Sequence, residues 1–450
     1  MFLKYSYKAA VLLYILFICI SLFPQGAVNP YEDSGIDSSV EQKPVITDEN
    51  AFDLLFDKDM NLAQEAETYL LLHTPEIQIP AIFQRIKTEK DRLVFEKILD
   101  IAARYPFEKS RKYWDDLMRI EASEDFQISV IQKYSSFGSR EIVYLLSEKI
   151  ESPYFSVREA ACVELEKLRN DRTFSKVFSM ALSDNPVKRL YASQALYYLY
   201  DKRFISVIGD MMKDKNKSVR LYTLRIIRKH NLEDLSFLVK AAAQNDENFE
   251  VKAAAMRTLV SMKNNSALYI FTRNLSDEMP EVRYAAADGI LFFRYKNAVF
   301  SVSKQLEAET DDNIKNVLID IHIKLKNGGG FSGLKKMVES ETNAYLRIKA
   351  VYAAGVIGGS VSENLLISAL NDGDFRVRAE AAAGLSSSRS RQALEGLLAA
   401  AGKDRSNYVR TAAVYALQNM KNRDAVSGLE EILKNENDIL MKKIISDSLK

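Results

Sequence analysis

The chain has 450 residues, of which 62 are lysine or arginine and 61 are aspartate or glutamate, so its formal net charge at pH 7 is +1. Without a long-range positive field to attract phosphate backbones, generic nucleic-acid binding is disfavoured. Only 17 glycines and 9 prolines are present to form the tight turns of an all-β fold, so the composition favours an all-α fold.

Residues 1–27 have the order of a secretory signal peptide. Two lysines precede an uncharged apolar run from residue 9 to residue 23, and this run is shorter than the about 20 residues of a membrane span. We therefore expect an extracytoplasmic protein, with the periplasm as its destination. Cleavage after Ala27 would place Gln25 where a small residue is preferred. An uncleaved segment that tethers the chain to the inner membrane is therefore the alternative.

Two segments separate this signal from the main part of the chain. Residues 28–50 are polar and acidic without helical periodicity, which predicts a flexible spacer. Residues 51–150 contain helical patterns but lack the repeat signature described next. Because the terminal units of a repeat protein must cover an exposed core end, we expect this segment to be a helical N-terminal cap of degenerate repeats.

Residues 151–450 contain an internal repeat in which an aliphatic residue, the anchor, is followed by a basic residue every 29 to 34 positions. Such spacing accommodates two short helices with two turns, so we predict about ten helical hairpins of about 31 residues each. The pairs are Val157-Arg158, Val187-Lys188, Val219-Arg220, Val251-Lys252, Val282-Arg283, Ile314-Lys315, Ile348-Lys349, Val377-Arg378 and Val409-Arg410.

The residues around each anchor have the period of an amphipathic helix. Small residues follow the anchor at three or four positions, and an apolar residue follows at eight positions in most units. An aspartate precedes several anchors by five positions, where it is expected to cap the helix and to pair with the basic residues in a ladder along one edge. These aspartates are Asp214, Asp246, Asp277, Asp372 and Asp404.

Units that read DFRVRAEAAAGL, SNYVRTAAVYAL and PEVRYAAADGI resemble HEAT repeats, in the short form named after phycobilisome lyases. The resemblance covers about residues 150–450. It implies an α-solenoid, a HEAT/armadillo-like right-handed superhelix of helical hairpins. It also implies that the first helix of each hairpin, which contains the anchor, lies outside and that the second lines a concave surface used for partners.

The residues that usually mark an enzyme are missing from the sequence. His73, His230 and His322 are far apart, and no Ser-His-Asp order, Walker loop or cysteine pair is present. We therefore expect no catalytic, metal or cofactor site. A glycine-rich run at residues 328–333 follows a helix instead of a strand, so we interpret it as a loop between helices and hypothesise that the solenoid flexes there.

Aromatic side chains gather in two units and form the candidate partner-binding set, with ordinary core packing as the alternative. We expect an exported, non-catalytic scaffold that binds a protein partner on its concave surface. Because the short-repeat namesakes attach bilins, a lyase-like enzyme or a chaperone for cofactor attachment is the alternative. The candidate residues are Tyr197, Tyr198, Tyr200, Phe292, Phe293 and Tyr295.

Overall fold

The computed structural model describes residues 43–48, 50–72 and 75–450. The expected signal peptide and most of the expected spacer lie outside these residues. All regular elements in the described part are helices. None of the described helices combines the length and the apolar character that crossing a membrane requires.

The described residues divide between two compact units, and the boundary falls between His73 and Thr74. In the first unit, the short helix α2 (Ala51–Leu54) precedes helix α3 (Met60–Leu72). Leu62, Ala66 and Leu70 form the buried side of α3.

The second unit is a stack of helical hairpins. Its helices are α4 (Pro75–Thr88), α5 (Arg92–Ala102), α6 (Phe107–Arg119), α7 (Glu124–Ser135), α8 (Val143–Lys149), α9 (Phe155–Leu168), α10 (Asp171–Ala181), α11 (Pro186–Tyr198), α12 (Ile205–Met211), α13 (Lys217–His230), α14 (Ser236–Asn245), α15 (Phe249–Ser261), α16 (Leu268–Asn274), α17 (Pro280–Phe293), α18 (Val299–Ala308), α19 (Asp312–Leu325), α20 (Phe331–Ser340), α21 (Ala344–Ile357), α22 (Gly359–Ala369), α23 (Phe375–Gly384), α24 (Arg391–Lys403), α25 (Asn407–Met420), α26 (Arg423–Asn435) and α27 (Ile439–Ser448). The predicted all-α solenoid of helical hairpins is confirmed.

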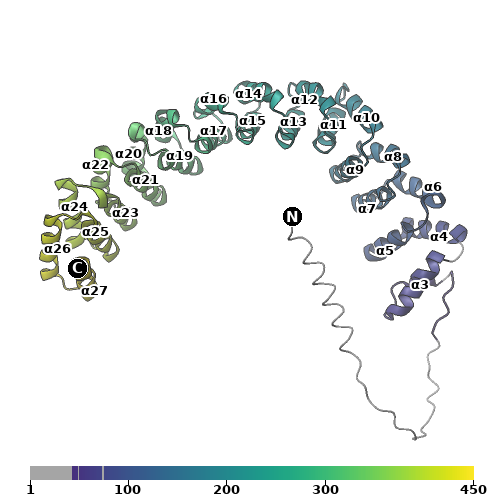
Figure 1. Ribbon diagram of the computed structural model, residues 1–450, viewed down its shortest axis with the longest axis horizontal. Coiled ribbons are helices and arrows are strands. Elements are labelled where there is room, and N and C mark those ends of the chain that lie inside the picture. The colour runs from purple at the N-terminus through teal and green to yellow at the C-terminus, as the bar shows by residue number, and fades with distance from the viewer. Residues whose placement is uncertain (1–42, 49, 73–74) are drawn as a thin grey trace, which may run out of the picture. The chain divides into compact units, whose positions relative to one another are not determined.

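Within the second unit the helices form two layers, and each hairpin contributes one helix to each layer (Figure 1). The odd-numbered helices from α5 to α27 pack on one another in sequence order, and the even-numbered helices form the other layer. Along this stack the odd-numbered layer lies on the concave side (Figure 1). The anchors are in the odd-numbered helices, so the expectation that anchor helices lie outside is wrong.

Side-chain size explains why the anchor helices take the concave side. Their buried faces are rich in alanine, as at Ala285 and Ala286 in α17 or Ala381 and Ala382 in α23. Small side chains let neighbouring helices approach closely, and helices that approach more closely make the shorter layer. In the other layer, larger side chains such as Phe271 in α16 are buried, and the Phe271 ring packs against Gly289 of α17.

The structure corrects the repeat register in two units. Val187 is 48% exposed, so it is not a core anchor, and Arg189 rather than Lys188 makes the contact to the next hairpin. In α21 the sequence offers two aliphatic-basic pairs, and the buried anchor is Leu346 instead of Ile348. With these corrections, the basic residues that follow the anchor position recur at intervals of 31 or 32 residues from Arg158 to Arg410.

The glycine-rich run forms a tight turn, η6 (Gly328–Gly330), that is packed against α18. A Cβ atom on Gly330 would lie 2.5 Å from the carbonyl oxygen of Val299, and one on Gly333 would lie 2.5 Å from that of Ser303. The Gly333 N–H also donates to Ser303 Oγ over 2.8 Å. These glycines allow close backbone packing against α18, and the hypothesis that the solenoid flexes there stays a prediction.

Candidate partner-binding surface

From α11 to the end of α26, a row of ion pairs joins successive hairpins; we call it the ion-pair ladder. Each pair links the basic residue after the anchor position to a carboxylate in the following hairpin, and no side chain of the ladder is more than 20% exposed. The pairs are Arg189–Asp214, Arg220–Asp246, Lys252–Asp277, Arg283–Glu309, Lys315–Glu341, Arg347–Asp372, Arg378–Asp404 and Arg410–Glu436.

The charged groups of the ladder form hydrogen bonds with one another and with nearby backbone groups. Arg220 donates from Nε and Nη2 to the Asp246 carboxylate, over 2.9 and 2.8 Å, and from Nη1 to the Asp214 carbonyl oxygen over 2.7 Å. Burial alone would raise the pKa of Glu309, but hydrogen bonds from Arg283 and from backbone N–H groups lower it to about 2. These groups hold hairpins in register and have little capacity left for a ligand.

Two of the candidate aromatics, Tyr197 and Tyr198, lie at the end of α11 and are only partly exposed. The Tyr198 hydroxyl donates to the Glu159 carboxylate on α9. The Lys229 ammonium lies 4.1 Å from the Tyr197 ring centroid and 4.9 Å from that of Tyr198, and it donates to the Tyr197 carbonyl oxygen over 2.8 Å. These rings are engaged by neighbouring hairpins.

Tyr200, the third candidate, follows α11 and stacks on the His230 ring at a centroid distance of 4.6 Å. Burial lowers the pKa of His230 below its usual value, although a hydrogen bond to the Tyr197 carbonyl oxygen opposes this shift. His230 therefore favours its neutral form.

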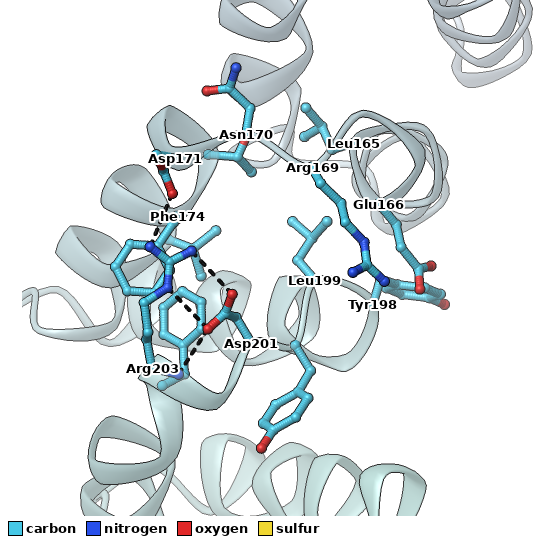
Figure 2. A pocket seen from close by; sticks show the side chains of 14 residues that line it. Leu165, Glu166, Arg169, Asn170, Asp171, Phe174, Tyr198, Leu199, Asp201 and Arg203 are labelled. Atoms are coloured by element: carbon cyan, nitrogen blue, oxygen red, sulfur yellow. Dashed lines mark hydrogen bonds and ion pairs between the residues drawn. The ribbon is translucent and has the colours of Figure 1, made fainter.

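Tyr198 and Tyr200 line a pocket of about 190 Å³ where α9 and α11 end (Figure 2). Arg203 lies at one side and donates to Asp201 over 3.0 and 3.1 Å and to Asp171 over 3.0 Å. Small-molecule sites usually occupy about 300 Å³ or more. The pocket therefore suits a single side chain better than a whole ligand.

The other three candidates lie at the end of α17, and α13 and α15 separate them from α11. Phe292 is exposed, whereas Phe293 is partly buried and contacts the Phe271 ring at a centroid distance of 5.8 Å. Tyr295 is partly buried in the turn that follows α17. The structure therefore distributes the six candidates between two separate places.

Sequence reasoning missed a larger group of exposed aromatics on three consecutive odd-numbered helices, α21, α23 and α25. Each of these side chains is between 45% and 65% exposed. We call this group the tyrosine face. It consists of Tyr345, Tyr352, Phe375, Tyr408 and Tyr415.

The repeat geometry brings the tyrosine face together. Tyr345 and Tyr352 are seven residues apart, which is about two helical turns, so both lie on one side of α21. Tyr408 and Tyr415 have the same spacing on α25, and α23 packs between these two helices. Phe375 on α23 contacts the Tyr408 ring edge-to-face at a centroid distance of 6.0 Å. This surface could have been predicted from the sequence by the position of each aromatic residue relative to the ladder arginine of its repeat. The local density of aromatics does not reveal it.

The remaining nucleophilic and metal-binding residue types are buried or dispersed. Burial raises the pKa of the Cys162 thiol to about 12, which disfavours the reactive thiolate. His322 is fully buried, and burial lowers its pKa to about 4. Within the described residues, no three His, Cys, Asp or Glu side chains are grouped so that they could hold a metal ion.

Three comparisons place the chain among known proteins. A family model for HEAT repeats matches residues 205–291, 331–418 and 363–450. No curated protein matches the chain significantly. Among solved structures, importin beta is 12% identical, with 88% of this chain and 60% of that chain covered and a TM-score of 0.45. Kap121p bound to Nup53p is 11% identical, with 89% and 48% covered and a TM-score of 0.49. The chain thus spans about half of the length of these structures.

Proposed function

Because the chain is a HEAT-repeat protein, we propose that it is an exported, non-catalytic scaffold that binds a protein partner through the tyrosine face. The exposure of five large aromatic side chains on three adjacent helices is the observation on which this proposal rests. Large exposed apolar groups are costly in water, and clusters of them on soluble proteins mark interaction surfaces. Tyrosine is also one of the residues that contribute most to binding energy at protein interfaces.

The charges around the tyrosine face favour a protein over a nucleic acid. Arg376 on α23 is paired with Asp374 over 2.7 Å, and Lys349 on α21 is paired with Asp320 over 2.7 Å. Cations that are already neutralised in this way attract phosphates weakly. A partner with its own apolar side chains matches this surface better.

The alternative function, a lyase-like enzyme or a chaperone for cofactor attachment, needs a site that encloses a cofactor. The pocket in Figure 2 holds about 190 Å³, which is less than the volume of typical cofactor sites. Its charged residues Arg203, Asp171 and Asp201 are bonded to one another. This pocket therefore gives the alternative no support.

Site-specific photocrosslinking in the native host tests the protein-binding surface. A benzophenone amino acid replaces Tyr352 or Tyr408, and the matched controls carry it at Phe237 on α14 or Phe300 on α18, which are exposed aromatics of the even-numbered layer. We expect one reproducible protein adduct from the tyrosine face and none from the controls. Equal labelling from both layers, or no adduct from Tyr352 and Tyr408, would contradict the proposal.

The proposed export rests on the order of charged and apolar residues in residues 1–27. Fractionation of host cells, followed by mass spectrometry of the mature N-terminus, tests it. A soluble extracytoplasmic protein that begins near Val28 is the expected result. An intact Met1 in the inner-membrane fraction would instead favour the tethered form, and recovery from the cytoplasm would overturn export.

A further inference from the structure

Glu380 stands out among the charged residues at the tyrosine face. It lies on α23, between the helices that present the tyrosine pairs, and it is half-buried. Among the described residues, no cationic side chain forms an ion pair with it. Burial without a compensating cation raises the pKa of its carboxyl group above the usual value.

The repeat shows what lies beside Glu380. Lys349 occupies the same repeat position on α21, two residues after the ladder arginine, and it reaches back to Asp320 on the preceding odd-numbered helix over 2.7 Å. The residue of α21 that is equivalent to Asp320 is Tyr352, since both follow the ladder cation by five residues. By this equivalence, Glu380 lies beside Tyr352. Lys349, at the equivalent position of the preceding repeat, instead has an aspartate as its partner.

The side chain next to Glu380 on the same side of α23 is small. At the repeat position where α21 carries Tyr352 and α25 carries Tyr415, α23 carries the exposed Ala383. Ala383 is three residues after Glu380, so the two lie on the same side of α23. Two exposed aromatic rings thus flank a strip that has a methyl group at its floor and a carboxylate at one end.

We propose that the protein partner presents a lysine or arginine side chain to this strip, where it lies over Ala383 between Tyr352 and Tyr415 and forms an ion pair with Glu380. This inference rests on the proposed function and specifies the chemistry of the partner. Cations bind favourably over tyrosine rings, and the long aliphatic part of either side chain packs on apolar surface. A charge-assisted hydrogen bond to Glu380 would supply the missing counter-ion.

Peptide binding to the full chain, followed by fluorescence anisotropy, tests this inference. The probes are labelled short peptides of serine and leucine that contain either arginine or citrulline, the uncharged analogue of arginine, at the same positions. We expect the arginine peptide to bind about tenfold more tightly than the citrulline peptide. Glu380→Gln should abolish this preference, whereas Glu281→Gln, which removes a carboxylate elsewhere on the odd-numbered layer, should leave it unchanged.

Charge reversal provides a second readout that does not depend on lost binding. Glu380→Arg should shift the preference toward a peptide with glutamate in place of arginine, while circular dichroism confirms that the variant is folded. Equal binding of the arginine and citrulline peptides by the wild type, or absence of any binding, would overturn the inference.

The failure of this inference is distinguishable from the failure of the proposed function. If the peptides bind equally but Tyr352→Ala and Tyr415→Ala weaken binding, the tyrosine face binds peptides and only the role of Glu380 is wrong. If the two tyrosine variants change neither peptide binding nor the photocrosslinked adduct, the proposed binding surface is wrong as well.

Discussion

Arg378 in α23 forms two hydrogen bonds with the carboxylate of Asp404, which precedes α25: Nε donates to Oδ2 over 2.7 Å and Nη2 donates to Oδ1 over 2.9 Å. The same carboxylate accepts a hydrogen bond from the Ser406 N–H over 2.8 Å. Arg378 also donates from Nη1 to the Asp372 carbonyl oxygen over 2.9 Å. One arginine therefore fixes its own turn and the beginning of the next hairpin.

We expect Arg378→Ala to lower the free energy of unfolding by about 3 to 5 kcal/mol, because it leaves Asp404 buried without a cation. The two side chains are only 6% and 9% exposed. Arg376→Ala is the control, because its pair with Asp374 is more exposed and exposed ion pairs contribute little to stability. Urea unfolding measures both variants, and similar losses would show that burial does not set the contribution of the ladder.

The ladder shows how far the sequence could predict this fold. The five aspartates that precede their anchors by five residues predicted a ladder of ion pairs along one edge. The structure places all five in ladder pairs. Glu309, Glu341 and Glu436 escaped the pattern because it was restricted to aspartate, although each glutamate lies five residues before its anchor position, as the aspartates do, and forms the same ion pair. The requirement for an aspartate five residues before the anchor was therefore too strict a criterion.

Prediction was weaker wherever the outcome depends on how helices pack in three dimensions. Periodicity identifies the apolar side of each helix but does not say which layer becomes concave, since this depends on side-chain volume in both layers. The tyrosine face was missed for the same reason, since it forms only when three helices pack side by side. Tyr345 and Tyr408 are distant in sequence, and only the corrected register places them at equivalent repeat positions.

The predicted apolar core supports a test of the register. Leu385 and Leu417 follow their anchors by eight residues, and each is only 1% exposed. Replacing either by alanine should cost about 2 to 5 kcal/mol of unfolding free energy, because lost apolar contacts and a residual cavity add together. Gln418→Ala, on the exposed side of α25, is the control and should be nearly neutral. Thermal unfolding indistinguishable from the wild type in both leucine variants would show the register to be wrong.

His322 makes the stability of the chain depend on pH. It is fully buried in α19 at the position where most repeats have an aliphatic residue, and within the described residues neither ring nitrogen has a hydrogen-bond partner. Burial lowers its pKa from 6.5 to about 4. Below pH 6.5 the unfolded chain therefore binds a proton that the folded chain does not, so stability is lost as the pH falls toward 4.

This contribution reaches about 3 kcal/mol at the acidic end, because each unit of pKa difference corresponds to about 1.4 kcal/mol. We expect His322→Leu to stabilise the chain at pH 7.5, since it removes two unsatisfied polar atoms, and to stabilise it more at pH 5. Carboxylates of the ladder also titrate in acid, so the quantity to compare is the difference between variant and wild type. A difference that does not grow between these two pH values would contradict the assignment.

Gly330 provides a test of whether the glycine-rich turn is packed or flexible. A Cβ at this position would lie 2.5 Å from the Val299 carbonyl oxygen, so we expect Gly330→Ala to shift α18 or α20 and to cost about 1 to 3 kcal/mol. Gly373→Ala is the control, because a Cβ there would have no heavy atom within 4 Å outside its chain neighbours and its φ is not in the left-handed region. If the turn were instead a hinge with loose packing, Gly330→Ala would be tolerated as well as Gly373→Ala, and amide hydrogens of residues 325–345 would exchange faster than those of the neighbouring hairpins. Slow exchange together with a large cost for Gly330→Ala alone would show that the backbone contact with Val299 couples the two hairpins into one continuous stack.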